Sequence, residues 1–116
     1  MTDLEKLQQM SLHDTAINSL QINFEARQLA LVVAPYNEAL DIYEELHLSF
    51  LGVNKLSSSF LETKTIPFNE VEVTSHEVTI LAGEMTVTFI ILTGFGEPSA
   101  KLSFAFEQVT LNQSRA

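Results

Sequence analysis

The apolar residues of this 116-residue chain recur at a fixed offset of 56 positions. The corresponding positions are Ile17, Ile22, Leu29, Leu31, Leu46, Leu48 and Phe50 in the first half and Val73, Val78, Met85, Val87, Leu102, Phe104 and Phe106 in the second. Within each half these residues alternate with other residues, which is the pattern of strands with one buried face. The alternation skips three positions after Phe50 and again after Phe106. The repeat therefore predicts two similar β-meanders packed into one domain.

Turn-forming residues divide each half into three strand segments. The first half is expected to begin with a hairpin over residues 20–33, and Pro35 ends its second strand because proline cannot donate to a ladder. A third strand is expected from about Ile42, and Gly52 marks a bulge or the end of that strand. The second half repeats this plan, with the tight turn Ala82-Gly83 in its hairpin and a change of phase near Ser75-His76.

One segment favours helix, and a second leaves helix and extended chain open. Thr2-x-x-Glu5 has the form of a capping box and predicts a short helix over residues 3–10. Residues 37–43 fit either a single helical turn capped by Asn37 or, from Ile42, extended chain.

The predicted fold is all-β with a short N-terminal helix. Three-stranded meanders must bury their apolar faces against each other, which gives an antiparallel sandwich or a flattened barrel. Residues 57–69 contain Phe60, Leu61, Ile66 and Phe68, so this connector is expected to cross the core rather than to separate two domains. We therefore expect a single domain over residues 1–116 with an internal pseudo-repeat at about 15–56 and 71–111.

The charge balance narrows the choice of partners. The chain has 15 acidic and 6 basic residues, for a net charge of −9, and no two basic residues are adjacent. Nucleic-acid binding needs clustered Lys or Arg, and anionic lipid would be repelled, so we expect neither nucleic acid nor membrane as a partner. A basic protein would be attracted. With no secretory signal and no apolar run long enough to span a bilayer, the expected location is the cytoplasm.

No set of residues predicts catalysis or a bound cofactor. Cysteine is absent, which excludes thiolate nucleophiles and cysteine-ligated metals. A metal site could in principle be drawn from His13, Asp14, His76 and Glu77, but nothing in their spacing requires them to meet. Gly94-x-Gly96 lacks the following helix that a dinucleotide loop needs. We therefore predict that the protein is not an enzyme and holds no metal or cofactor.

Two surface features are candidates for partner binding. Asp41, Glu44 and Glu45 form the acidic patch that we expect to face a basic protein partner. Ile90 and Leu92 point opposite to their apolar neighbours, so this strand is either central or covered by residues 57–69 on its second face, or it contributes to a ligand cavity or a homodimer interface.

Two stretches resemble a known group. They are Leu12-His13-Asp14-x-x-Ile17-x-x-Leu20-x-Ile22 and Leu46-x-Leu48-x-Phe50-x-Gly52-Val53-x-x-Leu56. The chain here resembles small all-β bacterial proteins of unassigned function, some of which are grouped with immunity proteins of toxin–immunity systems. The resemblance implies an acidic inhibitor that binds its toxin by surface complementarity and has no catalytic residues. No functional residue is carried over, because the matching positions have the character of core and turn positions.

Three functional hypotheses follow. The leading one is an acidic protein-binding module of the immunity type. A second is a small-molecule-binding β-barrel with a pocket lined by Phe89, Phe104 and Phe106. A third is a structural subunit that associates with copies of itself through exposed edge strands.

Overall fold

The computed structural model describes residues 1–59, 71–93 and 98–114 and confirms the all-β fold with a short N-terminal helix. The elements are α1 (Asp3–Gln9), β1 (Thr15–Asn23), β2 (Gln28–Ala34), β3 (Tyr36–Asn37), β4 (Ile42–Tyr43), β5 (Glu45–Leu51), β6 (Asn54–Ser58), β7 (Val71–Leu81), β8 (Glu84–Thr93), β9 (Pro98–Phe106) and β10 (Gln108–Ser114). Of the sequence predictions for the loops, those on residues 60–70 and 94–97 lie outside the described residues.

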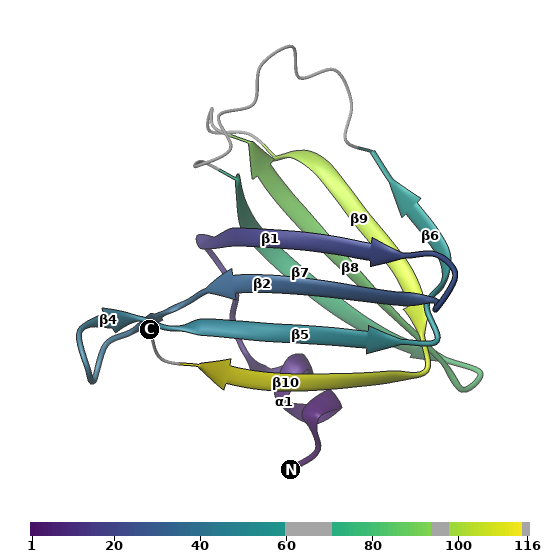
Figure 1. Ribbon diagram of the computed structural model, residues 1–116, viewed down its shortest axis with the longest axis horizontal. Helices are drawn as coiled ribbons and strands as arrows, with labels where there is room; N and C mark the ends of the chain where they lie inside the picture. Colours follow the sequence, from purple (N-terminus) through teal and green to yellow (C-terminus); the bar gives the residue numbers. More distant parts are fainter. Residues whose placement is uncertain (60–70, 94–97, 115–116) are drawn as a thin grey trace.

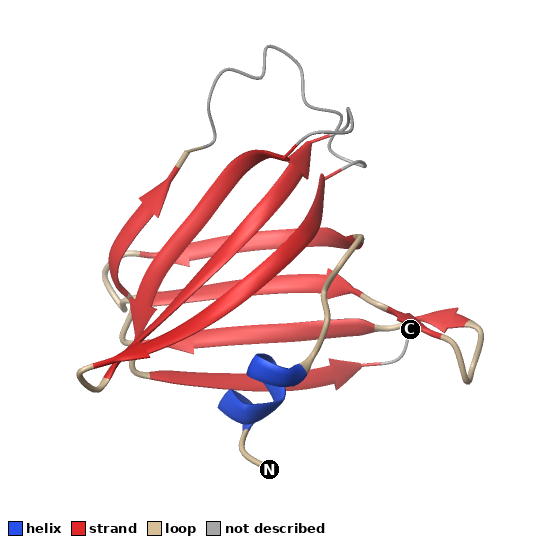
Figure 2. Cartoon of the chain, turned by 180° about the vertical axis from the view of Figure 1, so that it is seen from behind, coloured by secondary structure: helices blue, strands red, loops and turns tan. Residues whose placement is uncertain are grey.

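Eight strands form one antiparallel sheet that folds over into a sandwich. Its order is β10-β5-β2-β1-β7-β8-β9-β6, and β1 meets β7 through the residue pairs Thr15–Val73 and Ala16–Glu72. We call β10-β5-β2-β1 the first layer and β7-β8-β9-β6 the second layer. Figure 1 shows the first layer in front of β7, β8 and β9, and Figure 2 shows the reverse view, with the strands of the two layers running obliquely to each other. This arrangement is the sandwich that the alternating pattern predicted.

Each layer contains one strand more than the predicted meander, and that strand comes from the other half of the chain. β6 follows β5 in sequence but pairs with β9 in the second layer, while β10 follows β9 but pairs with β5 in the first. The chain changes layer at Gly52-Val53 and again at Glu107, the two places where the apolar alternation skips. The prediction of three strands per half was therefore incomplete, because the skip marks an exchange of strands between the layers.

The 56-residue repeat extends to irregularities of the backbone. β1 has a bulge between Ile17 and Ser19, where it pairs with β2, and β7 has one between Val73 and Ser75, where it pairs with β8. These positions correspond at the same offset of 56. The predicted change of phase near Ser75-His76 is this second bulge.

The core lies between the layers. Most of its largest buried side chains come from the inward-facing positions of β2, β5, β8 and β9, and are Leu29, Leu31, Val33, Leu48, Phe50, Phe89, Ile91, Leu102 and Phe104. Leu7 of α1, Leu12 and Val73 of β7 are also fully buried. The ring of Phe50 packs against those of Phe104 and Phe106, with centroid distances of 4.8 and 5.1 Å. β8 lies between β7 and β9, so the strand that carries Ile90 and Leu92 is central in its layer, as one of the predicted alternatives has it, and both side chains are half-buried.

The N-terminal segment closes one side of the sandwich. Thr2 and Glu5 form the predicted capping box of α1, and Leu7 buries its side chain completely in the core. Asp3 accepts a hydrogen bond from the Leu111 backbone N–H on β10, and the His76 ring on β7 bonds the Leu7 carbonyl at 2.7 Å. The helix is therefore fixed to both layers (Figure 2).

Candidate functional site

The three residues of the expected acidic patch lie in three different environments. Asp41 is exposed in the turn between β3 and β4, and Glu45 is half-buried at the start of β5. Glu44 is only 2% exposed, so it does not belong to a surface patch. The sequence suggested exposure because a carboxylate is almost never fully buried unless it has partners.

Glu44 has those partners, some from the neighbouring hairpin and one from the C-terminal strand. Its carboxylate accepts hydrogen bonds from the side-chain amides of Asn37 on β3 and Gln113 on β10. Its backbone N–H donates to the Pro35 carbonyl at 3.0 Å. These bonds attach the segment between β2 and β5 to the edge of the first layer, which is a structural role.

Residues 36–43 form a small hairpin rather than the helical turn that was one of the two predicted alternatives. Tyr36 pairs with Tyr43 and Asn37 with Ile42, as a separate two-stranded sheet. The Asn37 side chain accepts the Leu40 N–H at 3.2 Å, so the residue expected to cap a helix closes a turn instead. We call this element the 36–43 hairpin; Figure 1 shows β4 projecting from one end of the sandwich.

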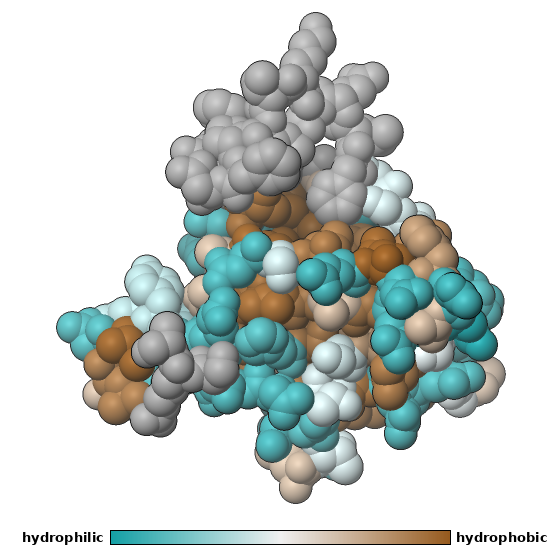
Figure 3. All heavy atoms as spheres, in the orientation of Figure 1, coloured by the Kyte–Doolittle hydropathy of each residue, from teal (hydrophilic) through white to brown (hydrophobic). Residues whose placement is uncertain are grey.

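The 36–43 hairpin exposes large apolar side chains next to carboxylates. The exposed fractions are 47% for Tyr36, 45% for Leu40, 40% for Ile42 and 69% for Tyr43. The two tyrosine rings lie 5.0 Å apart between centroids. In Figure 3 this apolar group stands apart from the main body, and the exposed Glu38 and Asp41 belong to the same hairpin. Sequence reasoning found Asp41 but missed the tyrosines, whose signal was the pair Tyr36 and Tyr43 around a polar turn.

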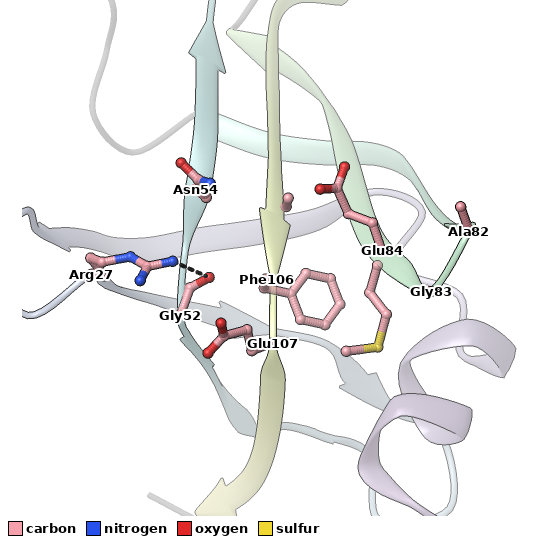
Figure 4. A pocket seen from close by; sticks show the side chains of 10 residues that line it. Arg27, Gly52, Asn54, Ala82, Gly83, Glu84, Phe106 and Glu107 are labelled. Atoms are coloured by element: carbon pink, nitrogen blue, oxygen red, sulfur yellow. Dashed lines mark hydrogen bonds between the residues drawn. The ribbon is translucent and has the colours of Figure 1, made fainter.

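The opposite end of the molecule has an open pocket of about 430 Å³ where four turns and crossings meet. The β1–β2 turn contributes Arg27, the β7–β8 turn contributes Ala82 and Gly83, and the two layer crossings contribute Gly52 and Glu107. We call it the turn-end pocket. Figure 4 shows the Phe106 ring between Glu107 and Glu84, with Arg27 on the far side of Gly52. No sequence pattern pointed to this pocket, because its residues come from four separate segments.

Charged groups of both signs surround the turn-end pocket. Arg27 donates from Nε to the Val53 carbonyl at 3.3 Å and from Nη2 to the Gly52 carbonyl at 3.5 Å. Glu84 is paired with Lys55, whose Nζ lies 2.9 Å from Oε2. Within the described part of the chain, neither Arg27 nor Glu107 makes an ion pair. One guanidinium and one carboxylate therefore line the pocket without a charged partner among these residues.

The two histidines considered as metal ligands form hydrogen bonds to backbone carbonyls. His13 bonds the Thr74 carbonyl through Nδ1 at 2.9 Å, and His76 bonds the Leu7 carbonyl through Nε2. Since a carbonyl can only accept, the proton of each bond is carried by the histidine nitrogen, Nδ1 in His13 and Nε2 in His76. Among the described residues, no three His, Asp or Glu side chains come together as a metal site.

The phenylalanines expected to line a pocket in the second hypothesis pack against one another and against Phe50. Phe89 and Phe104 are fully buried, and their centroids lie 6.4 Å apart with Phe50 packed edge-on against both. Phe106, at 4% exposure, forms part of the floor of the turn-end pocket. Of the three predicted rings, one therefore meets a cavity, and that cavity lies at the end of the sandwich.

Comparison with models of known protein families and with curated protein sequences found no match. Within the described residues, no helix combines the length and the apolar character needed to cross a membrane.

Proposed function

We propose that the protein is an acidic protein-binding module that docks a basic protein through the 36–43 hairpin. The observation that carries the proposal is the exposure of four large apolar side chains on one projecting element, next to the carboxylates of Glu38 and Asp41.

The composition of the hairpin suits a protein interface. Tyrosine is enriched among the residues that dominate binding energy, because it buries a large rigid surface and keeps a polar hydroxyl. Tyr36 and Tyr43 offer two such rings side by side, and Leu40 and Ile42 extend the apolar surface. A partner that covers these residues removes apolar area from water and gains the hydrophobic term.

The hairpin is also held in one orientation before binding. Asn37 bonds the Leu40 N–H within the hairpin and the Glu44 carboxylate at its base. Gln113 bonds the same carboxylate from β10. A preorganised element loses less conformational entropy on docking, so more of its contact energy appears as affinity.

Charge determines the kind of partner. The protein carries a net charge of −9, and exposed carboxylates at Glu38 and Asp41 flank the apolar surface of the hairpin. A partner with Lys or Arg around an apolar patch complements this surface and is steered to it. Two copies of this chain would instead repel each other, which favours a different protein over a homodimer.

An immunity-type inhibitor of a bacterial toxin is the specific form of this proposal that the sequence resemblance supports. In that form the hairpin covers a basic active-site surface of the toxin. The protein then needs no catalytic group of its own.

The test is a pull-down from native lysate with a salt-step elution, followed by titration of each captured protein in purified form. The matched variants are Tyr36→Ala with Tyr43→Ala on the hairpin and Phe24→Ala at the opposite end, where Phe24 is 77% exposed. The proposal expects a basic partner whose affinity falls at least about a hundredfold in the hairpin variant and stays unchanged in the Phe24 variant. Equal binding by both variants, or a partner that salt does not release, would contradict it. Light scattering of the purified chain separates this outcome from a homodimer.

A further inference from the structure

We propose that the turn-end pocket binds a free α-amino acid with an apolar side chain. This site is independent of the 36–43 hairpin, which lies at the other end of the sandwich (Figure 1).

The charges of the pocket match the two charges of such a ligand. Arg27 uses two of its five N–H donors on the Gly52 and Val53 carbonyls, which leaves three to bind a carboxylate. Glu107 supplies a carboxylate for the ligand's ammonium group, and Glu84, which also lines the pocket, is already held by Lys55. A ligand with only one charge would leave either Arg27 or Glu107 without a counter-charge.

The apolar part of the pocket lining is available to contact the ligand's side chain. Phe106 and Ala105 are buried beneath the pocket, and Met85 is half-buried beside them. The volume of about 430 Å³ lies in the range of small-molecule sites and is large enough for one amino acid. Figure 4 shows the Phe106 ring facing the space between Glu107 and Glu84.

The backbone fixes the walls of the pocket. Arg27, Gly52, Ala82 and Gly83 all adopt positive φ, at 54°, 67°, 52° and 80°. At Gly52 a Cβ would overlap the Glu107 carboxylate, so glycine there allows that carboxylate to lie against the crossing. Arg27 is tied to the same crossing through its two carbonyl bonds. Both charged groups are thus positioned by one short segment, which reduces the entropy lost when a ligand orders them.

The experiment is a titration of the ¹⁵N-labelled full chain with L-leucine, followed by NMR. We expect saturable shifts of the amides of Gly52, Asn54, Gly83 and Glu107, and a rise in the unfolding temperature with ligand concentration. N-acetyl-L-leucine lacks the ammonium group and L-leucinamide lacks the carboxylate, so each should bind at least about tenfold more weakly. Glu107→Gln should weaken L-leucine binding by a similar factor.

Glu25→Gln is the matched control, since it removes an exposed carboxylate from the β1–β2 turn outside the pocket. It should leave L-leucine binding unchanged. The proposal is overturned if L-leucine causes no saturable shifts up to about 10 mM. Equal binding of L-leucine and both analogues would also overturn it, because binding would then not depend on the ammonium and carboxylate groups of the ligand. The analogue series uses the unmodified chain, so the test does not depend on Arg27 variants folding.

Discussion

The two halves of the chain share one plan of strands but differ in structure at one pair of equivalent segments. Val33 to Leu46 in the first half and Phe89 to Leu102 in the second have equal spacing. In the first half β2 ends before Pro35 and the stretch becomes the 36–43 hairpin. In the second half Ile91 stands at the position of Pro35, and β8 continues to Thr93. One proline thus separates a projecting element from a longer strand, because it removes the N–H that would extend the ladder.

This comparison indicates which positions serve the fold and which are free to vary. Inward-facing positions remain apolar in both halves, as with Leu48 and Phe104, and the bulges of β1 and β7 coincide. The inward-facing position at the hairpin base differs, with Glu44 in the first half and buried Ala100 in the second. The exchange of β6 and β10 between layers means that neither half has its complete sheet alone.

The largest expected effect is at a pair of equivalent phenylalanines in the core. Phe50 is fully buried among three other rings, whereas its counterpart Phe106 is 4% exposed and borders the turn-end pocket. We expect Phe50→Ala to lower the free energy of unfolding by about 3–5 kcal/mol, because it leaves a closed cavity. Phe106→Ala should lower the free energy of unfolding by about 1 kcal/mol less than Phe50→Ala does, because the space it leaves opens to solvent. Urea unfolding of both variants measures the difference, and equal losses would mean that the two crossings are packed alike.

The second comparison is between Glu44 and its neighbour Glu45. Glu44→Ala gives the first half the alanine that the second half has at position 100, but leaves the amides of Asn37 and Gln113 without this acceptor. We expect a loss of about 2 kcal/mol and faster hydrogen exchange in the hairpin. Glu45→Ala removes a half-exposed carboxylate that bonds Asn18 and should cost no more than about 1 kcal/mol. Unchanged stability in Glu44→Ala would show that the hairpin is held by its own contacts.

The sequence was sufficient for the class of fold and for the inward-facing residues. Burial of one face leaves an alternation in the sequence that needs no knowledge of strand partners, which is why β2, β5, β8 and β9 were recognisable. β6 was not, because an edge strand of sequence Asn-Lys-Leu-Ser-Ser buries little and shows no clear period. Its pairing with β9, and that of β10 with β5, depends on which layer the chain enters after each skip.

The candidate sites were less predictable, for a related reason. The burial of Glu44 depends on Gln113, which lies 69 residues away, and strand alternation says nothing about such partners. The turn-end pocket joins Arg27 to Glu107 across most of the chain. The 36–43 hairpin has strands of two residues each, too short for a periodic pattern. Only Asp41 of the nominated acidic residues combined exposure with a position on this hairpin.

The third comparison concerns two glycines at positive φ. Gly83 occupies the two-residue turn between β7 and β8, where an added Cβ meets nothing within 4 Å, whereas a Cβ at Gly52 overlaps Glu107. Gly83→Ala should therefore cost about 1 kcal/mol from backbone conformation alone. Gly52→Ala should lower the free energy of unfolding more, by about 2 kcal/mol, because its Cβ also displaces the Glu107 carboxylate. Combining it with Glu107→Ala should remove this extra loss. If both glycine variants lose the same stability, Glu107 moves aside freely and the crossing does not fix its position.

The last expected effect is among the smallest and concerns a position where the 56-residue repeat is interrupted at the contact with the N-terminal helix. His76 corresponds to Leu20 in the first half, and its ring stacks on Phe89 at a centroid distance of 6.1 Å while bonding the Leu7 carbonyl. His76→Leu restores the repeat and keeps apolar contact with Phe89, but it leaves that carbonyl without its side-chain donor. We expect a loss of about 1 kcal/mol. Because the bond joins α1 to β7, hydrogen exchange should accelerate in α1 and remain unchanged in β8. A matched His13→Leu variant removes a bond to Thr74 outside the helix and should leave exchange in α1 unchanged. Acceleration throughout the sheet after His76→Leu would show instead that the histidine supports the core, and the break in the repeat would then serve packing rather than the attachment of α1.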